Sequence, residues 1–159
     1  MCSSDLTAAR KFHEEGLAAA RELADKISTA YALEGLGFEA CAQSDNAAAT
    51  RYFTESIALR REMGDHQGVL TCLEGLARIA VEERRLAEAA RLLGAVDQLR
   101  THYNYTPLAA EQADFERVVA RARQDMDQAA FDAAWSEGRT LTLESAIEQA
   151  GGPLNADRL

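Results

Sequence analysis

The sequence has few of the residues that would build a disulfide framework or a membrane-spanning segment. Its three cysteines are an odd number and form no CxxC motif, a pattern typical of reduced intracellular thiols. No apolar run approaches the roughly 20 residues that a membrane-spanning helix requires. The N-terminus also lacks the basic-then-apolar pattern of a secretory signal peptide. We therefore expect a cytoplasmic protein with no membrane partner.

Motifs for catalysis and for metal or nucleotide binding are also missing. The sequence has no glycine-rich phosphate loop ending in Lys-Ser or Lys-Thr, no HExxH and no GxSxG. No histidine has a second histidine four residues later, the spacing that indicates a metal site, and we expect His13 to be a core or boundary residue. The pairs Glu14-Glu15 and Glu82-Glu83 point in different directions on a helix and indicate solvated surface. We therefore predict that the protein is not an enzyme and uses no cofactor.

The composition favours helices and disfavours contact with nucleic acid. Alanine is very abundant, and glycine, proline and β-branched residues are scarce in the periodic stretches, which suits helices because alanine loses no side-chain entropy there. Acidic residues outnumber basic residues by 26 to 17, giving a net charge of −9. A surface this negative repels phosphate backbones, so we expect no direct nucleic-acid partner.

The chain contains an internal repeat of forty residues. The tetrapeptide Leu33-Glu34-Gly35-Leu36 recurs as Leu73-Glu74-Gly75-Leu76, and twelve of forty positions are identical between residues 11–50 and 51–90. A third copy of the second half is also visible, because Leu59-Arg60 returns as Leu99-Arg100. The glycines recur in register within predicted helices, where glycine costs about 0.5–1 kcal/mol relative to alanine. This recurrence predicts that two helices approach closely at each glycine.

Apolar residues three and four positions apart indicate two helices in each copy of the repeat. Cap residues separate the helices at Ser44-Asp45-Asn46 and Gly64-Asp65, and Thr106-Pro107 places a capping hydroxyl before a proline at the first helical position. Near the C-terminus, Phe131 and Trp135 share one helix face and are expected to anchor the last helices. The predicted helices lie near residues 7–24, 28–43, 46–63, 66–84, 86–103, 107–126, 128–138 and 142–150. We therefore predict an all-α fold of antiparallel helix pairs, because short connections make sequential helices antiparallel neighbours.

The two ends of the chain differ from the periodic region. Residues 1–6 (Met-Cys-Ser-Ser-Asp-Leu) resemble the translation of a common sequencing-adapter tail read from a GTG start codon. On this interpretation the leader is non-native and the natural sequence begins near residue 7; the alternative is an ordinary frayed N-terminus. We expect a single helical-repeat domain over residues 7–150 and a disordered tail over 151–159.

At the repeated positions the chain resembles the tetratricopeptide repeat, which has Leu-Gly and a small or aromatic residue in its first helix and alternating small and large residues in its second. The first copy shows Leu33, Leu36-Gly37, Ala40, Ala49, Phe53 and Ser56, and the second shows Leu73, Leu76-Ala77, Ala80, Ala89, Leu93 and Val96. The resemblance implies an α-solenoid of stacked helix pairs that binds a protein or peptide on its concave side.

The C-terminal half resembles the end of large bacterial transcriptional regulators that join an ATPase module to a repeat array. The likeness rests on residues 90–95, Pro107-Leu108, residues 131–139 and residues 141–147, in that order. It implies the sensor or partner-binding arm of a signal-transducing regulator, with another domain of the parent chain as one candidate partner.

The tetratricopeptide resemblance also implies which residues face the groove, because first helices line the concave side in that family. Repetition of glutamate at two of these positions would suit a basic peptide; the alternative is that these residues only solubilise the surface. A second hypothesis is a structural element that forms a homodimer through an exposed end of the array. The expected concave-face residues are Tyr31, Glu34, Phe38, Thr71, Glu74, Arg78 and Glu82.

Overall fold

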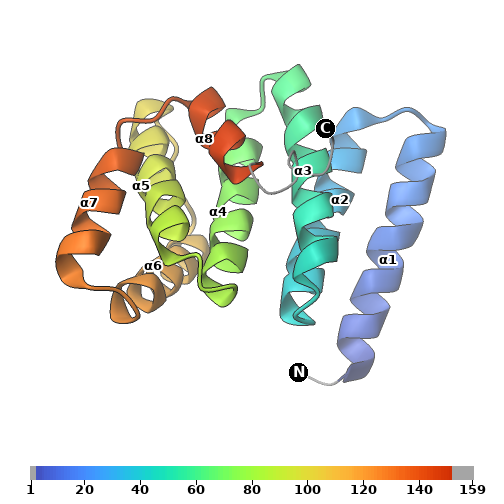
Figure 1. Ribbon diagram of the computed structural model, residues 1–159. Coiled ribbons are helices and arrows are strands. Elements are labelled where there is room, and N and C mark those ends of the chain that lie inside the picture. The colour runs from blue at the N-terminus through green and yellow to red at the C-terminus, as the bar shows by residue number, and fades with distance from the viewer. Residues whose placement is uncertain (1–2, 152–159) are drawn as a thin grey trace, which may run out of the picture. The chain divides into compact units, whose positions relative to one another are not determined.

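The computed structural model describes the backbone of residues 3–151 and the side chains of residue 8 and residues 10–151. The described residues form eight α-helices and no strand, so the all-α prediction is confirmed (Figure 1). The helices are α1 (Ser3–Glu22), α2 (Lys26–Ala42), α3 (Asn46–Met63), α4 (His66–Glu82), α5 (Leu86–His102), α6 (Ala109–Gln124), α7 (Gln128–Gly138) and α8 (Leu143–Ala150).

The observed helix ends lie within about two residues of the predicted ends, apart from the start of α1, which begins at Ser3 inside the segment 1–6. The prediction that Thr106 caps α6 is wrong. The cap residue is Leu108, whose N–H donates to the Glu111 carboxylate at 2.8 Å, and the Tyr105 hydroxyl donates to the same carboxylate at 2.8 Å. The Glu111 carboxylate therefore fixes the helix start two residues later than the proline suggested. Most of the predicted tail, residues 152–159, lies outside the described residues.

Five successive turns between helices share one geometry. In each turn a residue one or two positions after the helix has a left-handed backbone, and the next N–H donates to the carbonyl five residues earlier, as in a Schellman motif. The left-handed residues recur every twenty positions, at Ala24, Ser44, Gly64, Arg84 and Asn104. The closing bonds measure 2.8–2.9 Å and join Asp25 to Ala20, Asp45 to Ala40, Asp65 to Arg60, Arg85 to Ala80 and Tyr105 to Arg100.

An aspartate in the first three turns serves both helices that it joins. The backbone N–H of Asp25 closes α1, and its carboxylate accepts from the first turn of α2 at 3.0 and 3.1 Å. Asp45 and Asp65 do the same for the next two junctions, where they accept from Ala48 and Gly68. One side chain therefore ends one helix and begins the next, which confirms the predicted caps at residues 45 and 64–65.

We predict that replacing Ala24 by glycine stabilises the protein. The left-handed backbone at Ala24 (φ 52°) costs an L-residue about 1 kcal/mol, and glycine removes that strain. The expected gain is about 0.5–1 kcal/mol in the free energy of unfolding, measured by urea denaturation. Ala19→Gly is the matched control, because Ala19 lies inside α1 and its replacement should cost a similar amount. A destabilised Ala24→Gly variant would contradict the turn geometry.

The helices gather into two compact units, residues 1–75 and 76–159, with the boundary inside α4. Whether residues 7–150 form a single domain stays a prediction. In the first unit, α1 packs on α2 and α2 packs on α3, with neighbouring helices running in opposite directions (Figure 1). The Phe53 ring lies against the backbone of α2 and α4, because a Cβ at Gly37 or Gly75 would meet the ring at 2.6 or 2.4 Å. A Cβ at Gly35 would likewise meet the His13 ring at 2.7 Å, so the predicted lack of room for a Cβ is confirmed at both repeated glycines, Gly35 and Gly75.

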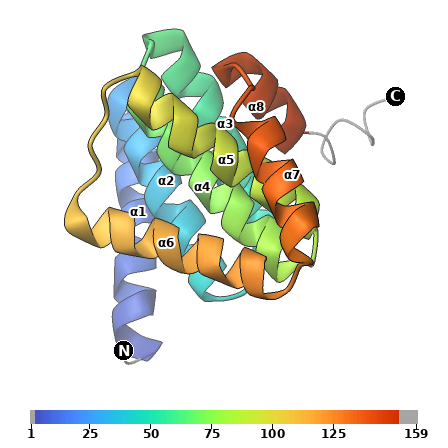
Figure 2. The same ribbon diagram turned by 90° about the vertical axis from the view of Figure 1, so that its left-hand side faces the viewer.

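In the second unit, α5 packs along α7 and also contacts α8 and α6 (Figures 1 and 2). Two glycines allow the backbones of α5 and α7 to meet. A Cβ at Gly94 would lie 2.3 Å from the Trp135 carbonyl oxygen, and a Cβ at Gly138 would lie 2.0 Å from the Arg91 carbonyl oxygen. Phe131 is fully buried and stacks on Trp135 with ring centroids 5.7 Å apart, so the predicted aromatic anchor of the last helices is confirmed.

Candidate functional site

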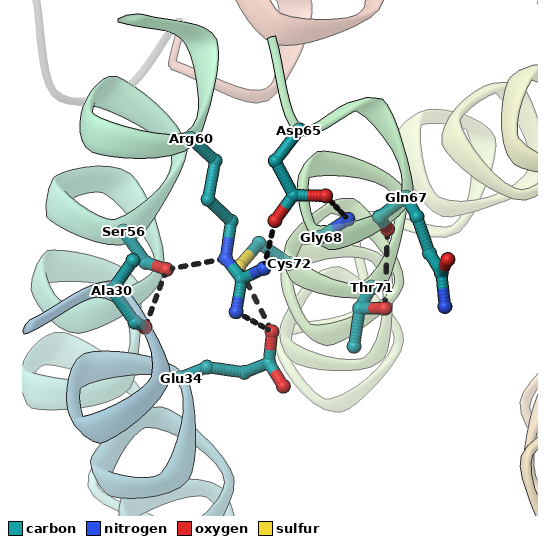
Figure 3. A network of polar contacts seen from close by, with 9 residues as sticks. All are labelled: Ala30, Glu34, Ser56, Arg60, Asp65, Gln67, Gly68, Thr71 and Cys72. Carbon is teal, nitrogen blue, oxygen red and sulfur yellow. Dashed lines mark hydrogen bonds and ion pairs between the residues drawn. The ribbon is translucent and has the colours of Figure 1, made fainter. Parts of the chain in front are cut away.

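A buried arginine joins three helices of the first unit (Figure 3). Arg60 on α3 is only 2% exposed. Its guanidinium donates to the Glu34 carboxylate of α2 at 2.8 Å, to the Ser56 hydroxyl of α3 at 3.1 Å and to the Asp65 carboxylate that caps α4. The Ser56 hydroxyl donates in turn to the Ala30 carbonyl of α2 at 2.9 Å. The planar guanidinium thus holds α2, α3 and the start of α4 in one polar network.

The Arg60 side chain is closely packed against Gly68 and stays charged. A Cβ at Gly68 would lie 1.7 Å from an Arg60 nitrogen, so a larger residue in the first turn of α4 would displace the guanidinium from its partners. Burial alone lowers the pKa of Arg60, but the nearby charges of Glu34 and Asp65 outweigh it and hold the pKa above its usual value. Arg60 therefore stays charged, and its positive charge neutralises the carboxylates that face it.

Cys72 of α4 lies beside this network, with its sulfur 3.9 Å from the Glu34 carboxylate. Burial raises the pKa of the Cys72 thiol to about 12, and the neighbouring Glu34 charge raises it further, against an opposing hydrogen bond from Ser56. A thiol held protonated in this way is a poor nucleophile. Cys72 is therefore a buried structural residue beside the Arg60 network and not a reactive thiol.

We predict that Cys72 makes the protein less stable at high pH. The unfolded thiol loses its proton near pH 9.0, whereas the folded thiol keeps it until about pH 12. Between these values the unfolded state binds fewer protons, so the free energy of unfolding falls as pH rises, by up to about 1.4 kcal/mol per pH unit. Urea denaturation at pH 8 and pH 10.5 should show a smaller fall for Cys72→Ala than for the unmodified chain. An equal fall in both would contradict this prediction.

A hollow of about 450 Å³ opens beside Arg60 in the first unit. The predicted residue Tyr31 lies there: it is 60% exposed, and the Arg60 guanidinium lies 4.7 Å from the centre of its ring. Ile27, one turn earlier on α2, is also 60% exposed. The hollow thus combines exposed apolar side chains with the buried Arg60, which ion pairs to Glu34 and Asp65 hold in place. Its lining residues are Ile27, Ala30, Tyr31, Arg60, Met63 and Asp65.

The other predicted residues of α2 are occupied within the chain. Glu34 accepts from Arg60, and its side chain is 19% exposed. Phe38 is half-buried and meets Phe53 edge-on with ring centroids 5.0 Å apart. Because the Glu34 carboxylate is neutralised by Arg60, it does not offer an unpaired negative charge to a basic peptide.

The predicted residues of α4 divide between two environments. Thr71 is half-buried and its hydroxyl donates to the Gln67 carbonyl at 3.3 Å, and Glu74 is also half-buried. Arg78 and Glu82 instead line a second hollow, of about 230 Å³, with residues of α6. The structure therefore places Tyr31 in one hollow and Arg78 with Glu82 in another.

The described residues contain no group of three or more His, Cys, Asp or Glu side chains that could hold a metal ion. His13 is half-buried and its Nδ1 lies 2.7 Å from the Glu39 carboxylate, which confirms it as a boundary histidine. No helix in residues 3–151 has the length and apolar character of a membrane span.

Sequence reasoning missed Arg60 and its partners Ser56 and Asp65 as a site. The available signal was the return of Leu59-Arg60 as Leu99-Arg100 forty residues later. Arg100 is also buried, at 6% exposed, and lies 4.5 Å from the centre of the Phe115 ring. In this chain, an arginine that recurs at the same position of the forty-residue repeat is thus buried in both copies.

Comparison with known proteins gives no relative, since no family model, no curated protein and no solved structure matches the chain.

Proposed function

We propose that this chain is a protein-docking module of the tetratricopeptide type. A partner would bind to the face formed by the first helix of each repeat, α2 in the first copy and α4 in the second. The observation that carries the proposal is the hollow beside Tyr31. Two large apolar side chains, Ile27 and Tyr31, are exposed there on a helix that the Arg60 network holds in place. Exposed apolar groups on a rigid support are typical of protein-binding surfaces, and tyrosine is enriched at their energetic centres.

The repeated turns support stacked helix pairs as the architecture of this module. The same left-handed turn and the same closing hydrogen bond occur every twenty residues from Ala24 to Asn104. Successive helices that leave identical turns favour a regular array, and such arrays bind extended peptides or helices along their first helices. The resemblance of residues 90–147 to the ends of bacterial regulators further suggests a partner-binding arm of a signal-transducing regulator.

Peptide display against the purified chain tests this proposal. We expect enriched peptides to bind the unmodified chain in the micromolar range and to lose about tenfold in affinity with Ile27→Ser and with Ile27→Ser/Tyr31→Ser. Leu108→Ser is the matched control, because Leu108 is 72% exposed but does not line the hollow. Circular dichroism confirms that the variants fold. If no peptide is enriched, or if the Leu108 control loses as much affinity, the docking surface is wrong.

Self-association is the second candidate, favoured by a stripe on α1. Phe12 is 73% exposed on α1, on the same face as Gly16 and Ala19, and Leu23, directly after the helix, is 80% exposed and continues this face. Leu17, by contrast, is 7% exposed and belongs to the core. Sedimentation across a dilution series should therefore compare the chain with Phe12→Glu/Leu23→Glu. A dimer that the double variant abolishes supports this candidate, and a monomer at all concentrations excludes it.

A further inference from the structure

The second hollow, of about 230 Å³, is lined by residues of the second unit alone. Apolar Val81 and Val118 lie among its charged residues. Arg117 and Arg121 are four residues apart on α6, as are Arg78 and Glu82 on α4, so each pair lies on one face of its helix. The lining residues are Arg78, Val81, Glu82, Asp114, Arg117, Val118 and Arg121.

Two arginines in this hollow differ from the other described arginines of the second unit. Arg117 pairs with Asp114, Arg123 lies 4.6 Å from the centre of the Phe131 ring, and Arg100 lies over Phe115. The remaining arginines pair with carboxylates: Arg84 with Asp125, Arg85 with Glu83 and Glu88, Arg91 with Glu137, and Arg139 with Asp97. Within the described part of the unit, only Arg78 and Arg121 have neither a carboxylate nor an aromatic ring as a partner, and both line the same hollow.

The charges of the hollow favour an anion although the whole chain carries −9. Arg117 and Asp114 neutralise each other, which leaves Arg78 and Arg121 against Glu82 alone. α6 is anchored to the second unit mainly by Phe115, which is 5% exposed, in its middle, and an exposed Arg84–Asp125 ion pair lies at one end. The two guanidinium groups are therefore carried on one site, and carboxylates and phosphates both pair with guanidinium in two-pronged geometry.

We propose that this hollow binds carboxylate side chains of an acidic segment of a partner protein. The inference rests on the proposed docking function and specifies the chemistry of the partner. A glutamate side chain has a carboxylate for Arg78 and Arg121 and an aliphatic stem for Val81 and Val118. The volume is below the roughly 300–1,000 Å³ of small-molecule pockets, which suits one or two side chains better than a whole ligand.

Fluorescence anisotropy of the full chain with a fluorescein-labelled peptide of alternating alanine and glutamate tests the proposal. We expect saturable binding that weakens as NaCl is raised, and no binding of the matched alanine–glutamine peptide. Arg78→Gln and Arg121→Gln should each weaken binding about tenfold. Arg51→Gln is the control, since it removes the same charge from an exposed position of α3 outside the hollow. Arg121 is exposed on α6, so its variant is expected to fold normally.

Three outcomes would overturn the proposal: no binding of the glutamate peptide, equal loss in the Arg51 control, or displacement of the peptide by free glutarate at the peptide's own affinity. The last would identify a small dicarboxylate as the ligand. Peptides that depend on Ile27 and Tyr31 remain a separate readout. If these bind and the glutamate peptide does not, only this inference fails; if neither binds, the docking function fails as well.

Discussion

Replacing Arg60 by alanine is expected to lower the free energy of unfolding by about 3 kcal/mol. The substitution removes the hydrogen bonds to Glu34, Ser56 and Asp65 and leaves the two carboxylates without their cation. Breaking a buried ion pair by removing one partner costs about 3–5 kcal/mol, and the partial exposure of Glu34 and Asp65 places this case at the lower end.

Urea denaturation followed by circular dichroism at pH 7 measures this effect. Arg51→Ala is the control, because Arg51 is exposed on the same helix and its removal should change stability by less than about 0.5 kcal/mol. Arg60→Lys should also be destabilised, since an ammonium group cannot reproduce the planar fork that reaches three partners. If Arg60→Ala is as stable as the Arg51 control, Arg60 does not hold the three helices together.

The second large effect is expected from Gly94→Ala/Gly138→Ala. Each new methyl group would collide with the backbone of the opposite helix, at the carbonyls of Trp135 and Arg91, and a backbone cannot turn aside as a side chain can. Overpacking typically costs about 1–3 kcal/mol for each site, against a gain in helix propensity of at most about 1 kcal/mol. The double variant should therefore lose about 3 kcal/mol and separate α7 from α5.

Trp135 provides the measurement for this prediction. It is the only tryptophan of the chain and lies at the contact itself, so its fluorescence reports the packing of α7 during urea denaturation. Gly16→Ala is the control: nothing lies within 4 Å of its added Cβ, and it should stabilise α1 by about 0.5–1 kcal/mol. An unchanged fluorescence midpoint in the double variant would contradict the backbone contact.

The helices were predictable from the sequence because two strong local signals agree. Apolar spacing marks the helix bodies, and aspartate or glycine marks the junctions at residues 45 and 64–65. The turns at Ala24 and Arg84 were not predictable, because alanine and arginine carry no preference for a left-handed backbone. Those residues take that conformation because the helices on either side pack and close the turn.

The site was only partly predictable, and the reason is the position of its charges. Tyr31 lines one hollow, and Arg78 and Glu82 line the other, but their role in binding a partner stays a prediction. Arg60 was missed because charged residues are rarely buried without partners, and its carboxylate partners Glu34 and Asp65 lie outside its own helix. Apolar periodicity locates helices, but it does not show which ion pairs form between them.

The uniform turns have a consequence for how such a chain varies in length. A deletion of residues 25–64 would join Ala24 to Asp65, and this new link would again place a left-handed residue before an aspartate that caps a helix. Insertions or losses of twenty residues therefore preserve the turn at the splice, and changes of forty also preserve the alternating direction of successive helices. Recombination that adds or removes forty residues would therefore give longer or shorter proteins in which every turn keeps the same geometry.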